Sequence, residues 1–323
     1  MARAIRFHAT GGPQVLQLDE VAVGDPGPGQ ARIRHTAIGV NFIDTYQRSG
    51  LYPVTLPCIC GNEAAGVVEA VGTGVQSVRV GDRVAYTGLI GAYTTERLAA
   101  AERLVPLPPG IGDEQAASMM LKGMTVHYLI HRTYPVRAGD TVLWHAAAGG
   151  VGLIACQWLA ALGVVVIATV GSEAKAQLAR AHGAAHVIDY TTESFVERVR
   201  AITDGRGVPV VFDSVGKDTW EGSLDCLRPL GTMVSFGNAS GAVPPVNIGI
   251  LAQKGSLFLT RPTLATYIAA PEDLAASAAA LFEAVGSGRV RVETSARYPL
   301  AEAAQCHRDL EARRTTGSVI LMP

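Results

Sequence analysis

The segment from residue 141 to residue 163 constrains the fold more than any other part of the sequence. It begins with a short apolar and β-branched run, Thr141–His145, which follows the turn pair Gly139-Asp140. From Leu153 to Leu162 the residues are almost all apolar, as in a buried helix, and Gly163 provides a helix stop. Val164–Thr169 is a second apolar run. The pattern predicts strand, turn, helix and strand, which together make a βαβ unit.

The turn inside this unit has small residues at the spacing G-x-G-x-x-G, with Ala147 in the first place. Small residues let the backbone turn sharply beside a pyrophosphate and let the new helix pack closely on the sheet. The N–H groups and the dipole of a helix start also favour phosphate charge. Such a turn can be a tight connection only, but the flanking strands and helix favour a dinucleotide site. Its expected residues are Ala147, Gly149, Gly150, Val151 and Gly152.

The composition is that of a globular protein. Apolar residues make up 48% and charged residues 17% of 323 residues, a length that suggests two domains. Lys and Arg number 27 against 28 Asp and Glu, so we expect no nucleic-acid partner and no membrane patch. No apolar run reaches the length of a membrane span and the N-terminus lacks a signal-peptide core, which predicts a cytoplasmic protein. The five scattered cysteines are expected to be reduced thiols.

The first 120 residues predict a β-rich domain. Alternating polar and apolar residues at Arg3–Phe7, Ala31–Ile38 and Gly66–Val71, separated by glycine-rich turns, predict short strands. We expect no helix between these strands, and therefore an antiparallel, barrel-like domain. A helix is expected from Asp113 to about Ile130, with Asp113 as its N-cap.

After residue 141 the sequence alternates between strand and helix patterns, which predicts a doubly wound parallel sheet of the Rossmann type. Pro209 favours the start or the edge of its strand because proline cannot donate to the ladder. The tail carries two alanine-rich helical patterns and a closing strand. The expected later strands are 186–190, 208–213, 231–237, 256–260 and 318–321, and the expected helices are 171–183, 194–202, 220–227, 271–286 and 300–314.

Five segments carry a resemblance to a known family: 41–53, 61–66, 121–125, 145–152 and 171–175. Together they resemble the NADPH:quinone oxidoreductases, the zeta-crystallin-like, zinc-independent branch of the medium-chain dehydrogenases/reductases. The resemblance covers essentially the whole chain. It implies a GroES-like catalytic domain at 1–122, a Rossmann NADPH-binding domain at 123–262 and a return to the catalytic domain at 263–323. It also implies a homodimer and reduction of a quinone or another electrophilic carbonyl compound.

Zinc-dependent relatives in this superfamily carry a cysteine and a histidine where this sequence has Asn41 and Asn62. Neutral amides are poor zinc ligands, because zinc sites use thiolate, imidazole and carboxylate. The four-cysteine lobe of those relatives is also absent, since Glu96–Pro106 contains no cysteine. We therefore predict that no metal is bound and that hydrogen bonds polarise the substrate.

The second strand of the βαβ unit ends without the acidic residue that binds the ribose hydroxyls of NAD. Ser172 and Lys175 can instead bind a 2′-phosphate through a hydroxyl and a positive charge. The resemblance implies that Gly171, Ser172, Lys175, Tyr190 and Arg313 take part, and we predict NADPH rather than NADH. Lys175 could alternatively be solvated and Tyr190 could simply pack.

The predicted chemistry is hydride transfer to a carbonyl compound in a site that excludes water. The resemblance implies that Asn41, Thr45, Tyr46 and Tyr52 face the nicotinamide ring across a cleft, and we expect Asn41, Tyr46 and Tyr52 to be catalytic. Their neutral donors suit a carbonyl oxygen, although a hydrogen-bonded core would use the same residue types. Lys122 could face the cofactor or the solvent, and His145 is expected to be structural. Further residues expected near the cofactor are Thr125, Tyr128, Ser214, Phe236, Gly237, Ser240 and Arg261.

Three other functions remain open. An enone or 2-alkenal reductase would have the same architecture. A nucleotide-binding protein with little turnover would hold NADPH without an acceptor. A zinc alcohol dehydrogenase is disfavoured by the two asparagines.

Overall fold

The structure is a computed structural model that describes residues 1–323. The chain forms two compact units. The β-rich unit comprises Met1–Met124, Tyr267–Gly286 and Val292–Pro323, and the nucleotide-fold unit comprises Thr125–Thr266 and Ser287–Arg291. The predicted divisions lie after residues 122 and 262. They place the short segment Ser287–Arg291 with the C-terminal return to the β-rich domain, whereas in the structure it belongs to the nucleotide-fold unit.

One side chain explains why this segment joins the nucleotide-fold unit. Gln157 donates from Nε2 to the Arg291 carbonyl oxygen (3.0 Å), and its Oε1 accepts from the Arg291 N–H (2.9 Å). Both polar atoms of one amide are thus paired with the backbone of a distant residue. Such pairing depends on the tertiary fold and leaves no sign in the local sequence pattern.

The nucleotide-fold unit contains a six-stranded sheet in which every pairing is parallel. Its strand order is β11-β10-β9-β12-β13-β14, which is the 3-2-1-4-5-6 order of a doubly wound dinucleotide fold. This confirms the predicted fold class. The strands are β9 Thr141–Trp144, β10 Val165–Val170, β11 His186–Asp189, β12 Val208–Asp213, β13 Leu227–Ser235 and β14 Phe258–Thr260.

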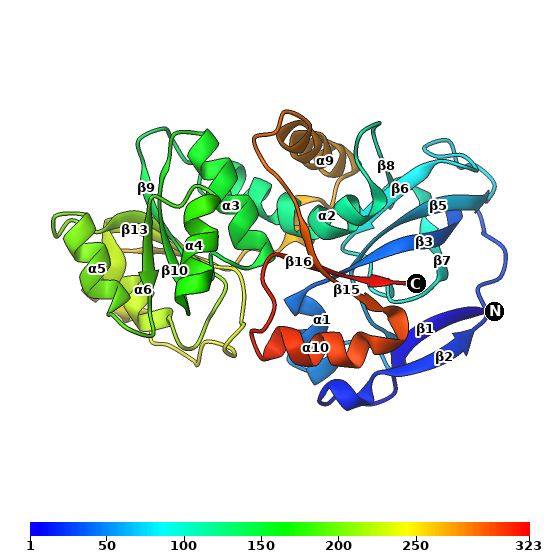
Figure 1. Cartoon of the computed structure of the whole chain (residues 1–323), viewed down its shortest axis with the longest axis horizontal. Helices are drawn as coiled ribbons and strands as arrows, with labels where there is room; N and C mark the ends of the chain where they lie inside the picture. Colours follow the sequence, from blue (N-terminus) through cyan, green and yellow to red (C-terminus); the bar gives the residue numbers. More distant parts are fainter. The chain divides into compact units, whose positions relative to one another are not determined.

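Helices pack on the faces of this sheet (Figure 1). They are α3 Gly150–Ala161, α4 Glu173–Ala181, α5 Phe195–Ile202, α6 Trp220–Cys226 and α7 Gly249–Gln253. Leu143, Ile167 and Val211 are fully buried in the apolar core beneath them. Pro209 is the second residue of the central strand β12, where the pairing register with β13 shifts between Val208 and Val210. Of the two positions expected for it, the strand start is therefore the observed one.

The β-rich unit contains two sheets. A three-stranded antiparallel sheet is formed by β1 Ala2–Phe7, β2 Gln17–Val21 and β4 Cys58–Ile59. A seven-stranded sheet follows the order β15-β16-β3-β5-β6-β8, with β7 paired to β3. Its strands are β3 Gln30–Val40, β5 Glu63–Val71, β6 Arg83–Thr87, β7 Glu96–Ala100, β8 Val105–Pro106, β15 Thr294–Pro299 and β16 Ser318–Met322. The last strand of the chain, β16, thus pairs with the C-terminal end of β3 (Figure 1).

Four helices complete the β-rich unit or enter it: α1 Phe42–Ser49, α2 Asp113–Tyr128, α9 Pro271–Gly286 and α10 Ala303–Glu311. The short helix α8 spans Leu264–Tyr267, and 3₁₀ turns occur at Pro13–Val15, Ala101–Arg103 and Leu300–Glu302. Helix α2 runs through the division between the units at residue 124 and continues as a π-helical turn, Leu129–Thr133.

Two predictions for the β-rich unit are wrong. Helix α1 lies between strands where no helix was expected. The strands within residues 1–120 pair only antiparallel, as expected, whereas β15 and β16 of the C-terminal tail pair in parallel. Asp113 is the first residue of α2 and not its N-cap, because the Gly112 carbonyl accepts the Ala116 N–H. The Asp113 carboxylate is instead held by Thr36 Oγ1 (2.8 Å) and by the guanidinium of Arg83.

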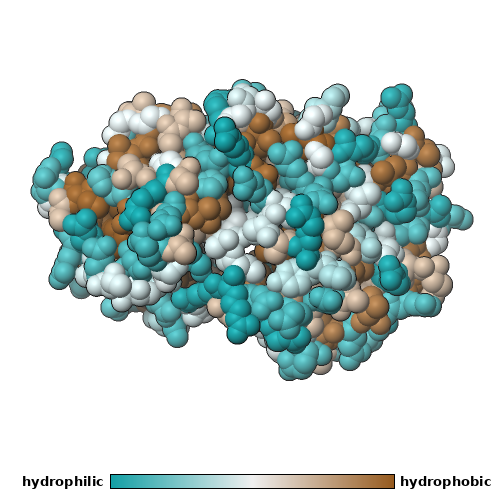
Figure 2. Space-filling model, in the orientation of Figure 1, coloured by the Kyte–Doolittle hydropathy of each residue, from teal (hydrophilic) through white to brown (hydrophobic).

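No helix is both long enough and apolar enough to cross a membrane. Hydrophilic and hydrophobic residues are interspersed over the face in Figure 2.

Candidate active-site residues

The glycine-rich turn connects β9 to α3 as the sequence predicts. Ala146 adopts a left-handed conformation (φ 53°), and the Ala147 N–H donates to the Thr169 carbonyl of the neighbouring strand (3.1 Å). Gly152 lies directly over this turn. A Cβ atom there would be 2.5 Å from the Cα and O atoms of Ala147 and 2.6 Å from the Ala146 oxygen. Only glycine therefore fits at position 152 without moving the backbone.

The N-terminus of α3 offers donors that the protein itself does not use. Gly149 is its N-cap residue, and no side chain caps the helix. The first three helical N–H groups, those of Gly150, Val151 and Gly152, have no acceptor within the protein. The first turn also contains no acidic residue. This helix end can bind a phosphate through its free N–H groups and its dipole.

A second polar group lies at the end of β10. Gly171 is covered by Tyr190, because a Cβ at Gly171 would lie 2.5 Å from the tyrosine oxygen. Ser172 is the N-cap of α4, and its Oγ accepts the Lys175 N–H (3.4 Å). Glu173, the acidic residue nearest to this group in the sequence, pairs with Arg180 (3.0 Å).

A buried hydrogen-bond chain supports the strand ends beneath the turn. Asp213 Oδ2 accepts from the Ser223 hydroxyl (2.8 Å), so the serine oxygen accepts from His145 Nε2 (3.0 Å). His145 Nδ1 then accepts from Thr169 Oγ1 (2.9 Å), which defines one neutral tautomer. Burial lowers the pKa of His145, against the attraction of Asp213. The structural role expected for His145 agrees with this geometry.

The loops after β12 and β13 carry further predicted residues. A Cβ at Gly237 would lie 2.5 Å from the Ser214 oxygen, so the two loops are in close contact. The Ser240 hydroxyl donates to the Val215 carbonyl (2.9 Å) and accepts the Asp218 N–H (3.0 Å), which ties the loops together. The half-buried ring of Phe236 lies 5.6 Å from the ring of Trp144.

Arg261 lies just beyond β14 in the same unit. Its Nη1 donates to the Ser235 carbonyl at the end of β13 (2.9 Å). Thr125 and Tyr128, on the last turn of α2, are both buried in the same unit.

In the β-rich unit, α1 carries the residues predicted to be catalytic. Asn41 is its N-cap, and the Asn41 N–H donates to Asp44 Oδ2 (2.8 Å). The Thr45 hydroxyl donates to the Phe42 carbonyl inside the helix (2.8 Å). Tyr46 is buried, with its ring 5.2 Å from that of Tyr52 in an edge-on arrangement. The structure therefore brings Asn41, Thr45, Tyr46 and Tyr52 onto one helix and the segment after it.

Two buried carboxylates, which the sequence reasoning missed, hold the asparagines. Asn62 Nδ2 donates to Asp44 Oδ1 (2.7 Å), and Asn41 Nδ2 donates to Glu63 Oε2 (2.8 Å). Lys122 is buried and lies 3.3 Å from Glu63 Oε2, so it is not a surface lysine. The pattern Asn41-x-x-Asp44, a capping signature at a helix start, was a sequence signal for Asp44. The sequence around Glu63 contains no comparable pattern.

Asp44 belongs to a longer buried network. Tyr93 donates from its hydroxyl to Asp44 Oδ2 (2.9 Å) and lies 3.0 Å from His307 Nε2. Arg48 donates to His307 Nδ1 (3.2 Å) and pairs with Glu311 (2.5 Å). Burial raises the pKa of Asp44 to about 6, although its hydrogen bonds oppose the shift. Burial and the charge of Arg48 lower the pKa of His307 to about 3.

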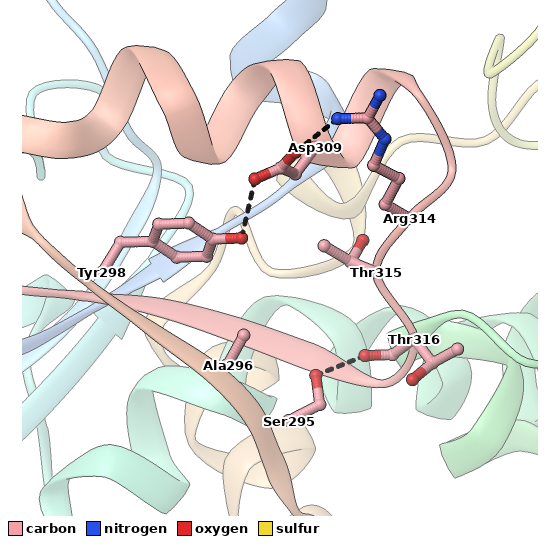
Figure 3. Close-up of a pocket in the computed structure, with 7 residues that line it drawn as sticks. All are labelled: Ser295, Ala296, Tyr298, Asp309, Arg314, Thr315 and Thr316. Carbon is pink, nitrogen blue, oxygen red and sulfur yellow. Dashed lines mark hydrogen bonds and ion pairs between the residues drawn. The ribbon is translucent and has the colours of Figure 1, made fainter.

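A separate cavity of about 320 Å³ lies in the β-rich unit (Figure 3). In it, Asp309 accepts from the Tyr298 hydroxyl (3.0 Å) and from Arg314 (3.2 Å). Burial is the larger cause and the hydrogen bond to Asp309 the next, and together they raise the pKa of Tyr298 to about 12. Arg313 directly precedes Arg314 and has a left-handed backbone (φ 59°) after α10, but it does not line this cavity. The lining residues are Ser295, Ala296, Tyr298, Asp309, Arg314, Thr315 and Thr316.

No group of three or more His, Cys, Asp or Glu side chains has an arrangement that could hold a metal ion. All five cysteines are free and buried. The amides of Asn41 and Asn62 are committed as donors to carboxylates.

The strand order and the uncapped α3 define a dinucleotide-binding fold. Residues 27–109 match the alcohol dehydrogenase GroES-like domain, and residues 150–284 match the zinc-binding dehydrogenase family. The chain is 58% identical to a quinone oxidoreductase of Pseudomonas aeruginosa over 100% of both chains. It is 47% identical to a 2-haloacrylate reductase of a Burkholderia species, over 100% of this chain and 99% of that one.

The crystal structure of Escherichia coli quinone oxidoreductase complexed with NADPH matches with a TM-score of 0.98 at 51% identity, over 100% of both chains. The chain therefore belongs to the quinone oxidoreductase family, as the sequence resemblance predicts.

Proposed function

We propose that the chain is an NADPH-dependent reductase of quinones that transfers hydride without a metal ion. The observation that carries this proposal is the free N-terminus of α3 beneath the glycine-rich turn, in a chain that belongs to the quinone oxidoreductase family. The two asparagines support the metal-free chemistry, because neutral amides bonded to carboxylates are poor zinc ligands.

The residues around α3 and α4 fit NADPH. The N–H groups of Gly150, Val151 and Gly152 would bind the pyrophosphate, and Ala147 and Gly149 leave room for it. Ser172, Lys175 and Tyr190 would bind the 2′-phosphate next to Gly171, since Glu173 is paired with Arg180 and does not repel it. When bound, NADPH supplies the hydride. Ser214, Phe236, Gly237, Ser240 and Arg261 would order its nicotinamide half, with Thr125 and Tyr128 as further contacts. Arg313 would be a further contact of the 2′-phosphate.

Neutral hydrogen-bond donors would bind the carbonyl oxygen of the acceptor. We assign Asn41, Tyr46 and Tyr52 to the polarisation of its carbonyl oxygen, with Thr45 supporting the nicotinamide contact. Amide and phenol donors aimed at a developing oxyanion stabilise it without a Lewis acid. A hydroquinone anion is a stable product that water can protonate, so quinone reduction needs no dedicated acid. The β-rich unit is then the catalytic domain and the nucleotide-fold unit the NADPH-binding domain, with divisions near residues 122 and 262.

We further propose that the protein is a cytoplasmic homodimer. The edge strand β14 exposes Phe258 (61%) and Leu259 (41%), and Ile248 is also exposed in the same unit (77%). An open sheet edge with apolar side chains favours pairing with a second copy. Five buried free thiols support a reducing compartment. The balanced charge favours no nucleic-acid partner.

A second candidate is an enone or 2-alkenal reductase, favoured by the 47% identity to a 2-haloacrylate reductase. Reduction of such a substrate leaves an enolate, which is more basic than a hydroquinone anion and needs a proton donor such as Tyr46.

The test is NADPH oxidation with 1,4-benzoquinone, 9,10-phenanthrenequinone and a 2-alkenal, measured side by side. Turnover of the quinones at the higher kcat/KM supports the proposed function. Turnover of the alkenal alone would replace it with the second candidate. Tight NADPH binding without any turnover would indicate a nucleotide-binding protein.

A further inference from the structure

Glu63 is one of two fully buried carboxylates beside the predicted catalytic residues, the other being Asp44. The Glu63 side chain is completely inaccessible to solvent, on the first residue of β5. Three donors surround it: the Leu121 N–H at Oε1 (2.8 Å), and Lys122 Nζ (3.3 Å) and Asn41 Nδ2 (2.8 Å) at Oε2. Gly39 lacks the Cβ atom that would collide with this carboxylate, so the backbone of β3 makes room for it.

The charge of Lys122 balances that of Glu63. An ionised carboxylate without partners is costly in a protein interior, whereas one with a cation and two further donors is tolerated. Lys122 is 6% exposed, so it has little access to solvent as an alternative partner. The pair is therefore a fixed feature of the β-rich unit.

The Glu63–Lys122 pair determines whether the nitrogen or the oxygen of the Asn41 amide points toward it. A carboxylate can only accept hydrogen bonds, so the Asn41 nitrogen, and not its oxygen, must point toward Glu63. The second N–H of that planar nitrogen then diverges from the first and remains available to another acceptor. An asparagine without such a partner could present its oxygen in the same place, where it would repel a carbonyl oxygen.

We propose that Glu63, charge-balanced by Lys122, is a positioning residue that holds Asn41 as a hydrogen-bond donor to the carbonyl oxygen of the acceptor. This inference rests on the proposed function, in which Asn41 polarises that oxygen. Asp44 likewise accepts a hydrogen bond from Asn62. However, Asn62 Nδ2 donates to both Asp44 Oδ1 and Gln47 Oε1 (2.7 Å each). Both N–H groups of the Asn62 side chain therefore have acceptors within the protein. Of the two asparagines, Asn41 is the one whose second side-chain N–H can donate to the substrate.

The test combines three variants of the full-length protein. The double variant E63Q/K122M removes the carboxylate and the cation together, so no buried charge is left unpaired. Asn41→Ala removes the amide, and a triple variant combines all three changes. The matched control is R34M/E69Q, because Arg34 and Glu69 form an exposed ion pair (2.8 Å) between the same strands, β3 and β5. This control should keep wild-type kinetics.

We expect Asn41→Ala to lower kcat/KM for 1,4-benzoquinone by about 100-fold, the typical loss for one oxyanion donor. E63Q/K122M should lower it by about tenfold or more through misplacement of that donor, with the Kd for NADPH unchanged. The triple variant should be no slower than Asn41→Ala. Two outcomes would overturn the positioning role of Glu63 and leave the proposed function intact. One is a loss of kcat/KM in the triple variant equal to the product of the two separate losses. The other is full turnover in E63Q/K122M together with slow turnover in Asn41→Ala. Full turnover in Asn41→Ala would also remove the proposed role of Asn41.

A second measurement does not depend on turnover. In protein labelled with ¹⁵N at asparagine, the Asn41 side-chain amide is identified by its loss in Asn41→Ala. One of its two protons should be shifted downfield by the charged acceptor in the wild type and should lose that shift in E63Q/K122M. An Asn41 amide signal that is the same in both proteins refutes the positioning role, whether or not the wild type reduces quinones.

Discussion

Replacing Gly152 by alanine should disable the phosphate-binding turn without removing any functional group. The added Cβ would lie 2.5 Å from Ala147 Cα and O, and 2.6 Å from the Ala146 oxygen. All three atoms belong to the backbone, so no side chain can rotate away. Ordinary contact begins at about 3.4 Å, so α3 and the turn must separate by about 0.9 Å.

A shift of this size acts on both stability and binding. Overpacking at a close backbone contact costs about 1–3 kcal/mol. The N–H groups of Gly150, Val151 and Gly152 would move relative to the turn that shapes the phosphate site. We expect the Kd for NADPH to rise by about 10- to 100-fold, equivalent to about 1.4–2.8 kcal/mol.

The assay is titration of NADPH fluorescence, with a thermal melt of each variant. Gly286→Ala is the matched control, because a Cβ at Gly286 meets no atom within 4 Å. Gly149→Ala provides an intermediate case, since its Cβ would be 3.3 Å from the Ala146 oxygen. Wild-type affinity in a folded Gly152→Ala protein would refute the reasoning, as would an equal loss in Gly286→Ala.

Four further predictions follow from particular contacts. Lys175→Ala should raise the KM for NADPH by about tenfold, equivalent to about 1.4 kcal/mol, and leave that for NADH unchanged; equal effects would contradict a 2′-phosphate role. Tyr46→Phe should lower kcat/KM for an enone by about tenfold or more and that for a quinone by less, whereas equal losses would mean that Tyr46 only packs. His307 has its pKa lowered from 6.5 to about 3, so its neutral ring stabilises the fold above pH 6.5 and this stability is lost as pH falls toward 3. His307→Gln should therefore flatten the decline of the melting temperature with acid, and an unchanged slope would exclude this histidine as a cause. Phe258→Lys on the exposed edge of β14 should yield monomers in sedimentation velocity, and an unchanged dimer would assign the interface elsewhere.

The nucleotide-fold unit could be predicted from the sequence because its signals are local. The strands β9 and β10 are continuous apolar runs, and α3 is apolar on nearly every side between a glycine turn and a glycine stop. A parallel sheet with helices on both faces requires this pattern, since its strands are buried on both sides. The observed ends differ from the expected ones by only a few residues.

Helix α1 could not be predicted in this way because it breaks the usual relation between polarity and burial. Its residues Asp44, Thr45 and Arg48 are buried, whereas an amphipathic helix buries apolar residues. The Thr45 hydroxyl is bonded within the helix, whereas Asp44 and Arg48 are tolerated because they have partners from distant segments. Arg48 and Glu311, for example, are 263 positions apart in the chain.

The amino-acid sequence was enough to predict the βαβ unit, the small residues of its turn and the two asparagines where zinc relatives have ligands. These features depend on residue type and spacing, which a sequence displays directly. The folded structure was needed to show that Glu63 and Lys122 are paired in the interior, that Glu63 holds Asn41 and that Asp44 holds Asn62. The physical reason is that a polar group can be buried only where the fold supplies its partners, and 59 positions separate Glu63 from Lys122.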